Sequence, residues 1–282
     1  MAIGTLYLCA TPIGNLGDMT ARGIEILKTV DLIAAEDTRN SIKLLNHFDI
    51  HTPMTAYHEF NRFDKADELV RKILEGANVA CITDAGTPGI SDPGQVLAEK
   101  CIEAGITVTS VPGASACISA LIISGLSTRR FRFEAFLPVE KKERAAILRE
   151  ISEDTATLVL YEAPHRLKKT LAELLTVFGD RRIAICKELT KLHENVNRTT
   201  LQGAVAFYET EEPKGEFVLV IEGKTLAGKK QEAEKAWAEM TLEEHMAYYE
   251  KQGVYRKEAM KKVAADRGIS KRDVYRELLE KE

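Results

Sequence analysis

The sequence predicts an α/β protein with two domains, a parallel sheet in the first and a mixed sheet in the second, followed by a small helical tail. Three observations predict this fold. The chain has 282 residues, 45% of them apolar, which is enough for two hydrophobic cores. Short apolar runs alternate with helix-length amphipathic segments over most of the chain. After Gly223 no segment has the pattern of a strand.

The first domain, residues 1–117, is expected to hold strands that alternate with helices. The apolar or extended runs are residues 5–10, 31–35, 53–57, 78–83 and 107–111. Runs that are apolar almost throughout are typical of parallel strands covered by helices on both faces. Two of the helical segments between them end at Gly76 and Gly105, which suits the left-handed position that often follows a helix.

The second domain, residues 118–227, has strand patterns that are less regularly spaced. We expect strands at residues 131–139, 155–162, 182–189 and 216–223, with helices between them. Residues 195–201 and 215–223 are expected to pair antiparallel, which would make this sheet mixed.

The tail, residues 228–282, is expected to be helical and to end in a helix-turn-helix. Residues 258–281 have apolar positions at helical spacing, broken by Gly268 and restarted by Ser270 as an N-cap. Basic side chains lie along the second helix, as in a nucleic-acid reader. A solvated helical hairpin that packs on another surface fits the pattern equally well.

Composition excludes several classes of protein. No run of eighteen apolar residues and no signal peptide occurs, so we expect a cytoplasmic protein without a membrane span. The five cysteines form no CxxC pair and the six histidines lack ligand spacing, so reduced cysteines and no metal site are expected. Residues 251–282 carry a net charge of +4 and residues 1–250 one of −8, so a nucleic acid would have to meet local basic patches.

The segment ITDAGTPGISDPG, residues 82–94, predicts a ligand site. It follows a strand and precedes a helix, and open α/β sheets bind ligands at the carboxyl ends of their strands. Its glycines permit close approach, so backbone amides are the expected recognition surface. Residues 10–20 and 110–119 form similar loops after other strands. No GxGxxG or GxxxxGK[ST] motif indicates a dinucleotide or nucleoside triphosphate.

A fourth loop, AAEDTRNS at residues 34–41, concentrates charge after a predicted strand. Its side chains could face a substrate, or Asp37 or Thr38 could cap the next helix with Arg39 in water. Both interpretations stay open.

Five segments occur in series over nearly the whole chain: LYLCATPIGNLGDMT, AAEDTRNS, ITDAGTPGISDPG, VPGASA and YEAPHRL. Together they resemble the ribosomal RNA small subunit methyltransferase I family, a branch of the tetrapyrrole (corrin/porphyrin) methylases. The resemblance implies two α/β domains that clamp S-adenosylmethionine, and a homodimer. It also implies methyl transfer to the 2′-hydroxyl of a cytidine in the decoding region of 16S rRNA.

The resemblance also implies which residues bind the cofactor. GTPGI, residues 86–90, matches the superfamily's cofactor loop, with Thr87 where many relatives have aspartate; whether Asp84 takes over that role stays open. The implied cofactor residues are Asp84, Gly86, Thr87, Pro88, Ile90, Pro112, Gly113, Ser115, Ala116, Tyr161 and Ala163.

A ribose hydroxyl is a poor acid, so a general base is expected. The candidates are Glu36, Asp37, Lys187 and Glu188, and the sequence does not choose among them. For Lys187 and Glu188, a plain ion pair is the commoner role.

RNA contacts are predicted from loops and from cations. The candidates are Pro12, Asn15, Arg39, Arg130 and Arg166. Arg130 belongs to the densest basic stretch outside the tail, residues 129–144, which also holds Phe131 and Phe133. These two rings alternate as core residues of a strand do.

Two other functions are compatible with the chain. A methylase of a small tetrapyrrole would share the cofactor loops, although it has no need of the tail and lacks the AAEDTR segment. A regulatory protein could sense a ligand with the α/β body and touch nucleic acid with the tail, without catalysis.

Overall fold

A computed structural model describes residues 2–225, 227–228 and 237–279. Residues 1–152 and 156–222 form one compact unit, and residues 153–155 belong with the segment from Gly223 onward. The predicted domain boundaries at 117/118 and 227/228 stay predictions. Parts of the predicted tail, residues 229–236 and 280–282, lie outside the described residues.

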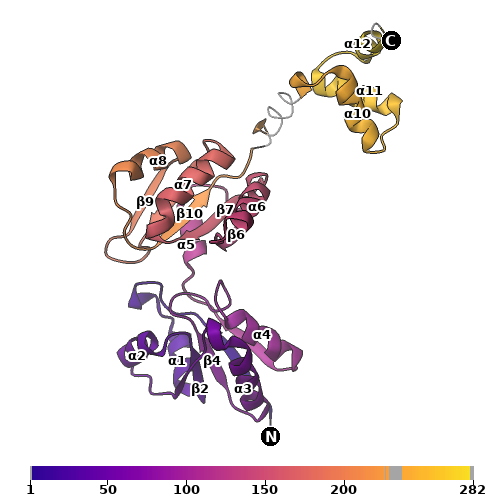
Figure 1. Ribbon diagram of the computed structural model, residues 1–282. Helices are drawn as coiled ribbons and strands as arrows, with labels where there is room; N and C mark the ends of the chain where they lie inside the picture. The colour runs from indigo at the N-terminus through magenta and orange to yellow at the C-terminus, as the bar shows by residue number, and fades with distance from the viewer. Residues whose placement is uncertain (1, 226, 229–236, 280–282) are drawn as a thin grey trace. The chain divides into compact units, whose positions relative to one another are not determined.

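The first sheet is parallel, as predicted. Its strand order is β3-β2-β4-β1-β5, and the sheet lies in the lower part of Figure 1, where β2 and β4 are labelled. The strands are β1 (Thr5–Cys9), β2 (Leu32–Ala35), β3 (Met54–Ala56), β4 (Val79–Ile82) and β5 (Thr107–Val111). Because β4 is buried at every position, it suits a place inside the sheet with helices on both faces.

Four helices cover the two faces of this sheet. Leu27 of α1 and Leu45 of α2 join one core cluster, and Leu69 of α3 and Leu97 of α4 join another. The helices are α1 (Ala21–Thr29), α2 (Thr38–His47), α3 (Arg62–Leu74) and α4 (Gly94–Glu103), with 3-10 turns η1 (Leu16–Asp18) and η2 (Glu59–Asn61). Gly76 and Gly105 follow α3 and α4 with positive φ, which confirms the predicted helix ends.

The second sheet is mixed, with the order β6-β7-β10-β8-β9. Strands β6 and β7 are parallel, whereas β10 runs antiparallel to β7 and β8. The strands are β6 (Phe131–Phe136), β7 (Thr157–Glu162), β8 (Arg182–Lys187), β9 (Asn195–Thr200) and β10 (Phe217–Ile221).

The predicted pairing of β9 with β10 is wrong, because β9 pairs with β8. All five residues of β10 are buried, so this strand lies in the middle of the sheet. The sequence NVNRTT of β9 is polar and partly exposed, which suits an edge strand.

Strand β6 contains a β-bulge. Phe133 lies opposite Val159 and Ala135 lies opposite Leu160, so Glu134 is the extra residue in the pairing. Ala135 has φ of 55°, which is uncommon for a residue other than glycine. From this point the strand presents its side chains in reversed alternation.

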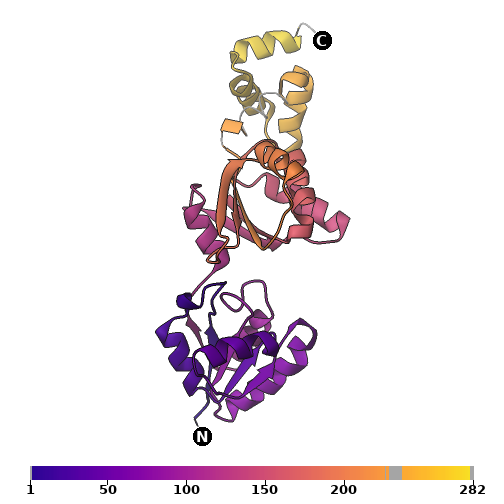
Figure 2. The same ribbon diagram turned by 90° about the vertical axis from the view of Figure 1, so that its left-hand side faces the viewer.

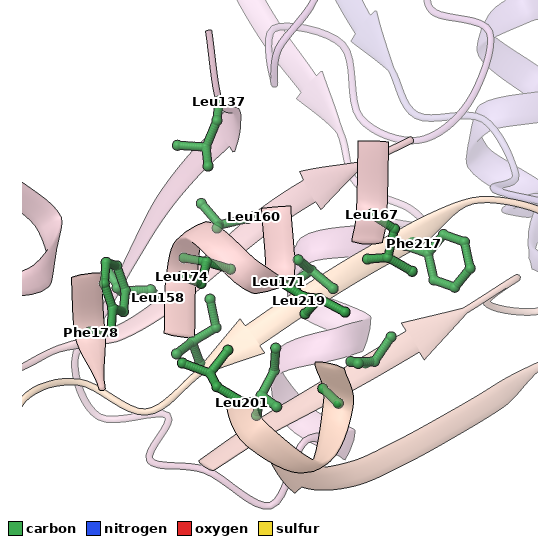
Figure 3. Packing of buried hydrophobic residues seen from close by; sticks show 14 of the residues in the cluster. Leu137, Leu158, Leu160, Leu167, Leu171, Leu174, Phe178, Leu201, Phe217 and Leu219 are labelled. Atoms are coloured by element: carbon green, nitrogen blue, oxygen red, sulfur yellow. The ribbon is translucent and has the colours of Figure 1, made fainter. Parts of the chain in front are cut away.

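Helices also cover both faces of the second sheet. Leucines of α7 pack over Phe217 and Leu219 of β10, as Figure 3 shows, and α6 and α8 complete this core. The opposite face packs on α5. The helices are α5 (Ala116–Ile123), α6 (Lys141–Ser152), α7 (Pro164–Phe178) and α8 (Leu201–Thr210).

The tail is helical, as predicted, and Figure 2 shows its helices near the C-terminus. They are α10 (Leu242–Lys251), α11 (Arg256–Arg267) and α12 (Lys271–Leu279). Gly268 has the left-handed φ of 64°, and the Ser270 hydroxyl accepts the Asp273 amide at 3.1 Å. The two predicted helices and the turn at Gly268 are therefore present, and their role as a nucleic-acid-reading helix-turn-helix stays a prediction.

The five cysteines are buried and unpaired, as expected for thiols that pack as small apolar groups. Within the described ranges, no helix has the length and apolarity needed to cross a bilayer. The same ranges hold no group of three or more His, Cys, Asp or Glu side chains that could bind a metal.

Candidate active site

Three glycine-containing loops meet at the carboxyl ends of the parallel strands. Thr11, after β1, exchanges backbone hydrogen bonds with Gly86, after β4, at 2.9 and 3.1 Å. The buried Thr11 hydroxyl donates to the Thr83 carbonyl at 3.1 Å. The Thr87 hydroxyl donates to the carbonyl of Ala114, after β5, at 3.0 Å. The first two loops are 75 residues apart in the sequence and the last two are 27 residues apart. The contacts hold all three together at one edge of the sheet.

Asp92 shapes the loop after β4. Its carboxylate accepts the amides of Gly89, Ile90 and Gly94 at 2.8 to 3.2 Å. Gly86 and Gly89 have φ near +89°, a conformation that favours glycine. Burial raises the pKa of Asp92, although the amide hydrogen bonds oppose this effect. One side chain therefore holds the backbone of this loop in place.

The loop after β2 is tied to the loop after β4 by carboxylates. Glu36 Oε2 accepts the Thr83 hydroxyl at 2.6 Å and the Asp84 amide at 3.3 Å. Asp84 in turn accepts the Asp37 amide at 3.2 Å and the Asn40 side-chain amide at 3.3 Å. Burial, with the charges of Glu36 and Asp37, raises the pKa of Asp84.

A cavity of about 380 Å³ lies beside these loops and between residues of both sheets. This volume is within the range of small-molecule and cofactor sites. Among the described residues that line it, four are acidic and none is Lys or Arg. The lining consists of Ile13, Glu36, Thr83, Ala85, Gly86, Thr87, Ile90, Ser91, Asp92, Ser115, Ala116, Phe136, Tyr161, Glu162, Ala163, Pro164, Cys186, Leu189, Glu216, Phe217 and Val218.

Comparisons with known proteins agree with this geometry. The family model described as Tetrapyrrole (Corrin/Porphyrin) Methylases matches residues 5–205. A relative from Halalkalibacterium halodurans, named Ribosomal RNA small subunit methyltransferase I, is 49% identical over 273 residues, 96% of this chain and 93% of its own length. A relative of the same name from Synechocystis sp. is 48% identical over 281 residues, 99% of both chains. The chain belongs to this methyltransferase family.

Solved structures agree on the fold. Diphthine synthase has a TM-score of 0.61 at 15% identity and covers 79% of this chain and 91% of its own. Uroporphyrin-III C-methyltransferase from Thermus thermophilus, solved with S-adenyl homocysteine, has a TM-score of 0.56 at 18% identity and covers 77% and 97%. The predicted fold is confirmed, and family membership confirms an S-adenosylmethionine-dependent methyltransferase. The family favours neither the tetrapyrrole substrate nor the non-catalytic sensor.

Seven of the eleven residues expected at the cofactor of this methyltransferase line the cavity, together with the candidate base Glu36. The seven are Gly86, Thr87, Ile90, Ser115, Ala116, Tyr161 and Ala163. Burial raises the pKa of the Tyr161 hydroxyl, and the neighbouring Cys117 raises it further.

The other four expected cofactor residues are not among those that line the cavity. Pro88 is buried, and Asp84 bonds to the loop after β2. Gly113 lies where a Cβ would come within 2.9 Å of the Ala10 Cβ, so it permits two loops to pack closely. Pro112 is exposed beside it. Their assignment to the cofactor stays a prediction.

Of the four candidate bases, Glu36 alone lines the cavity. Asp37 caps α2 through the Arg39 amide, and a hydrogen-bonded ion pair with the Arg39 side chain lowers its pKa to about 2. Glu188 accepts the Glu216 amide, which lowers its pKa, and pairs with Lys191 at 3.0 Å. The ion pair expected between Lys187 and Glu188 is thus replaced by one with Lys191.

The candidates for RNA contacts lie in different surroundings. Arg166 donates to the Leu137 carbonyl at 2.5 Å and pairs with Glu162 at 3.3 Å, so it serves the fold. Arg39 is 88% exposed while paired with Asp37. Arg130 is exposed at the start of β6, about 20 Å from the cavity by strand length.

The remaining two candidates lie after β1. Pro12 is buried. Asn15 is exposed, and its side-chain oxygen accepts the Gly17 amide at 2.9 Å as the cap of η1. The structure therefore gives local structural roles to both, and their contact with RNA stays a prediction.

The basic stretch at residues 129–144 offers fewer free cations for RNA contact than its composition suggests. Arg132 pairs with Glu134 at 2.7 Å and with Glu150 at 2.9 Å. Arg144 is buried and pairs with Glu173 at 2.6 Å. Two of its cations therefore stabilise the second domain instead of facing a ligand.

Sequence reasoning missed the acidic residues Asp92, Glu162 and Glu216 and the aromatic residue Phe136. Glu162 is 2% exposed and accepts the hydroxyl of Thr170, which in turn accepts from Arg144. The YEAPHR segment contains Glu162 and its partner Arg166, but Thr170 lies 8 positions away from Glu162 and outside that segment. Asp92 stood in the SDPG turn, where an aspartate that accepts nearby amides is a recognisable signal.

Proposed function

We propose that this protein methylates the 2′-hydroxyl of a cytidine in the decoding region of 16S rRNA, with S-adenosylmethionine bound in the cavity. The observation that carries the proposal is the cavity itself, lined by the glycine loops after β4 and β5 and by carboxylates. Relatives that are 48–49% identical over at least 96% of the chain carry the name Ribosomal RNA small subunit methyltransferase I.

The lining fits the charge of the proposed cofactor. S-adenosylmethionine carries a sulfonium and an ammonium group, and a cavity with four acidic residues and no basic ones favours cations. The Thr87 side chain donates to the Ala114 carbonyl, so it stabilises the loop.

When bound, S-adenosylmethionine supplies a methyl group that is already activated for transfer. The residues of the chain have to orient the acceptor oxygen in line with it, which is worth roughly 7 to 11 kcal/mol when the reactants are restrained. We propose that Glu36 takes the proton of the 2′-hydroxyl. Both of its hydrogen bonds given above fall on Oε2, so Oε1 can point to the acceptor.

The RNA partner, a homodimer and a cytoplasmic location are parts of the same proposal. The helix-turn-helix carries Lys271, Arg272 and Arg276, and residues 251–282 have the surplus of positive charge that an RNA contact needs. The cavity region has the opposite charge, so we propose that phosphates are held by the tail and only the acceptor nucleoside enters.

The experiment is mass spectrometry of ribosomal RNA from a bacterium that lacks the corresponding gene, with and without this protein. The expected result is one 2′-O-methylcytidine that appears only on complementation and disappears with Glu36→Gln. Methylation of another molecule, or of no RNA, would contradict the proposal.

A further inference from the structure

The β-bulge of β6 brings an aromatic ring to the cavity. Without the extra residue Glu134, Ala135 would lie opposite Tyr161 and Phe136 would point to the other face of the sheet, where α7 packs. With it, Phe136 lies opposite Tyr161, on the face that carries Phe133. A β-bulge next to an active site commonly redirects one side chain in this way.

A neighbouring ring holds the Phe136 ring in place, but much of it is exposed to solvent. It contacts Tyr161 edge to face, with ring centroids 5.6 Å apart, and Tyr161 contacts Phe133 in the same way at 5.0 Å. Phe136 lines the cavity and is nevertheless 51% exposed. A large apolar side chain that is held at a cavity and open to solvent is suited to a flat ligand that enters from outside.

The charge of the cavity restricts what that ligand can be. Glu36, Asp92, Glu162 and Glu216 line it, and no described lining residue is basic. Arg166 and Lys191 pair with Glu162 and Glu216 from outside the lining. Because the described lining itself offers no cation to a phosphate, the acceptor nucleotide is not held there by its backbone. Stacking on an aromatic face needs no charge and accepts any base.

We propose that Phe136 stacks on the nucleobase of the acceptor nucleotide, and this rests on the proposed function. The base leaves the RNA stack, its flat face lies on the Phe136 ring, and its ribose is thereby directed toward the carboxylate of Glu36. Phe136 is a substrate-binding residue, because it touches the base and not the reacting atoms. The adenine of the cofactor is the competing ligand for this ring.

The structure favours the acceptor base over the adenine. The cofactor loops contribute partly or fully buried residues such as Gly86, Thr87 and Ala116, which require a ligand that lies inside the cavity. Phe136 is the most exposed of the aromatic residues in the lining. The acceptor base belongs to an RNA that approaches from solvent, so it contacts the exposed Phe136 ring before the buried residues.

The test compares Phe136→Ala, Phe136→Trp and the control Phe131→Ala. Phe131 is the same residue type on the same strand with similar exposure, 42%, but it lies opposite Thr157 and does not line the cavity. Steady-state methylation is measured with small ribosomal subunits from a bacterium that lacks this activity. Titration calorimetry with S-adenosylhomocysteine gives cofactor affinity for each variant.

We expect Phe136→Ala to raise the KM for subunits by about 5- to 150-fold, the usual effect of removing one stacking ring. Its affinity for S-adenosylhomocysteine should stay within about twofold, Phe136→Trp should restore KM, and Phe131→Ala should match the wild type. An unchanged KM, an equal effect of Phe131→Ala, or a loss of S-adenosylhomocysteine affinity alone would overturn the inference. A wild-type protein that methylates no subunit would instead overturn the proposed function.

Discussion

The replacement Glu36→Gln separates chemistry from binding and folding. Glutamine has the size of glutamate and keeps an oxygen that can accept the Thr83 hydroxyl, now at 2.6 Å from the carboxylate. It cannot take a proton from a ribose hydroxyl. A general base accelerates the chemical step by about 10²- to 10⁴-fold, so we expect kcat to fall by that factor.

The expected change in stability is small because two effects oppose each other. Loss of the charge weakens the hydrogen bond from Thr83 by about 1 kcal/mol. It also removes repulsion from Asp84 and Asp92, whose pKa values are raised first by burial and also by the charge of Glu36. The melting temperature should therefore change by no more than about 2 to 4 °C.

The assay is kcat for methylation of small ribosomal subunits at saturating S-adenosylmethionine, with calorimetry for S-adenosylhomocysteine. Loss of one of four carboxylates should weaken that binding by about fivefold at most. Asp37→Asn is the control, since asparagine caps a helix as well as aspartate does and should leave kcat nearly unchanged. A kcat for Glu36→Gln within threefold of wild type, or an equal loss in Asp37→Asn, would refute the reasoning.

Three further predictions follow. Thr87→Arg should abolish S-adenosylhomocysteine binding in calorimetry with the circular dichroism unchanged, because it fills the cavity, whereas Thr87→Ser should bind normally; normal binding by both would contradict the site. Removal of residues 228–282 should raise the KM for subunits and leave cofactor affinity alone, since this whole segment belongs to a separate unit. Loss of both would show that the α/β body needs the tail. Burial and the Arg267 charge lower the pKa of His245, which stacks on Trp237 with ring centroids 4.0 Å apart. The folded tail thus binds fewer protons than the unfolded chain, so this stability is present above pH 6.5, the ordinary pKa, and is lost as the pH falls below it. Fluorescence of Trp237, the single tryptophan, should report that loss on chemical unfolding, and a His245→Gln variant with the same pH dependence would contradict it.

The sequence predicted most of what depends on local pattern. The strands of the first sheet, the glycine loops and the caps at Asp37 and Ser270 follow from hydrophobic period and turn chemistry. The central place of β10 does not, because strand order depends on contacts between distant segments. Phe136 was missed for the same reason, since one extra residue reverses the face of every later side chain and leaves no mark in composition.

Ile13, from the loop after β1, belongs to the core cluster of the second sheet and is only 8% exposed. Its neighbours there include Cys117 of α5 and Val218 of β10, while Ile13 itself lines the cavity. Any opening motion that draws the two sheets apart must transfer this side chain to water, at a cost of roughly 1.5 to 3 kcal/mol. If S-adenosylhomocysteine leaves through such a motion, its rate of release is lowered by about 10- to 150-fold. Product release would then limit the rate of turnover.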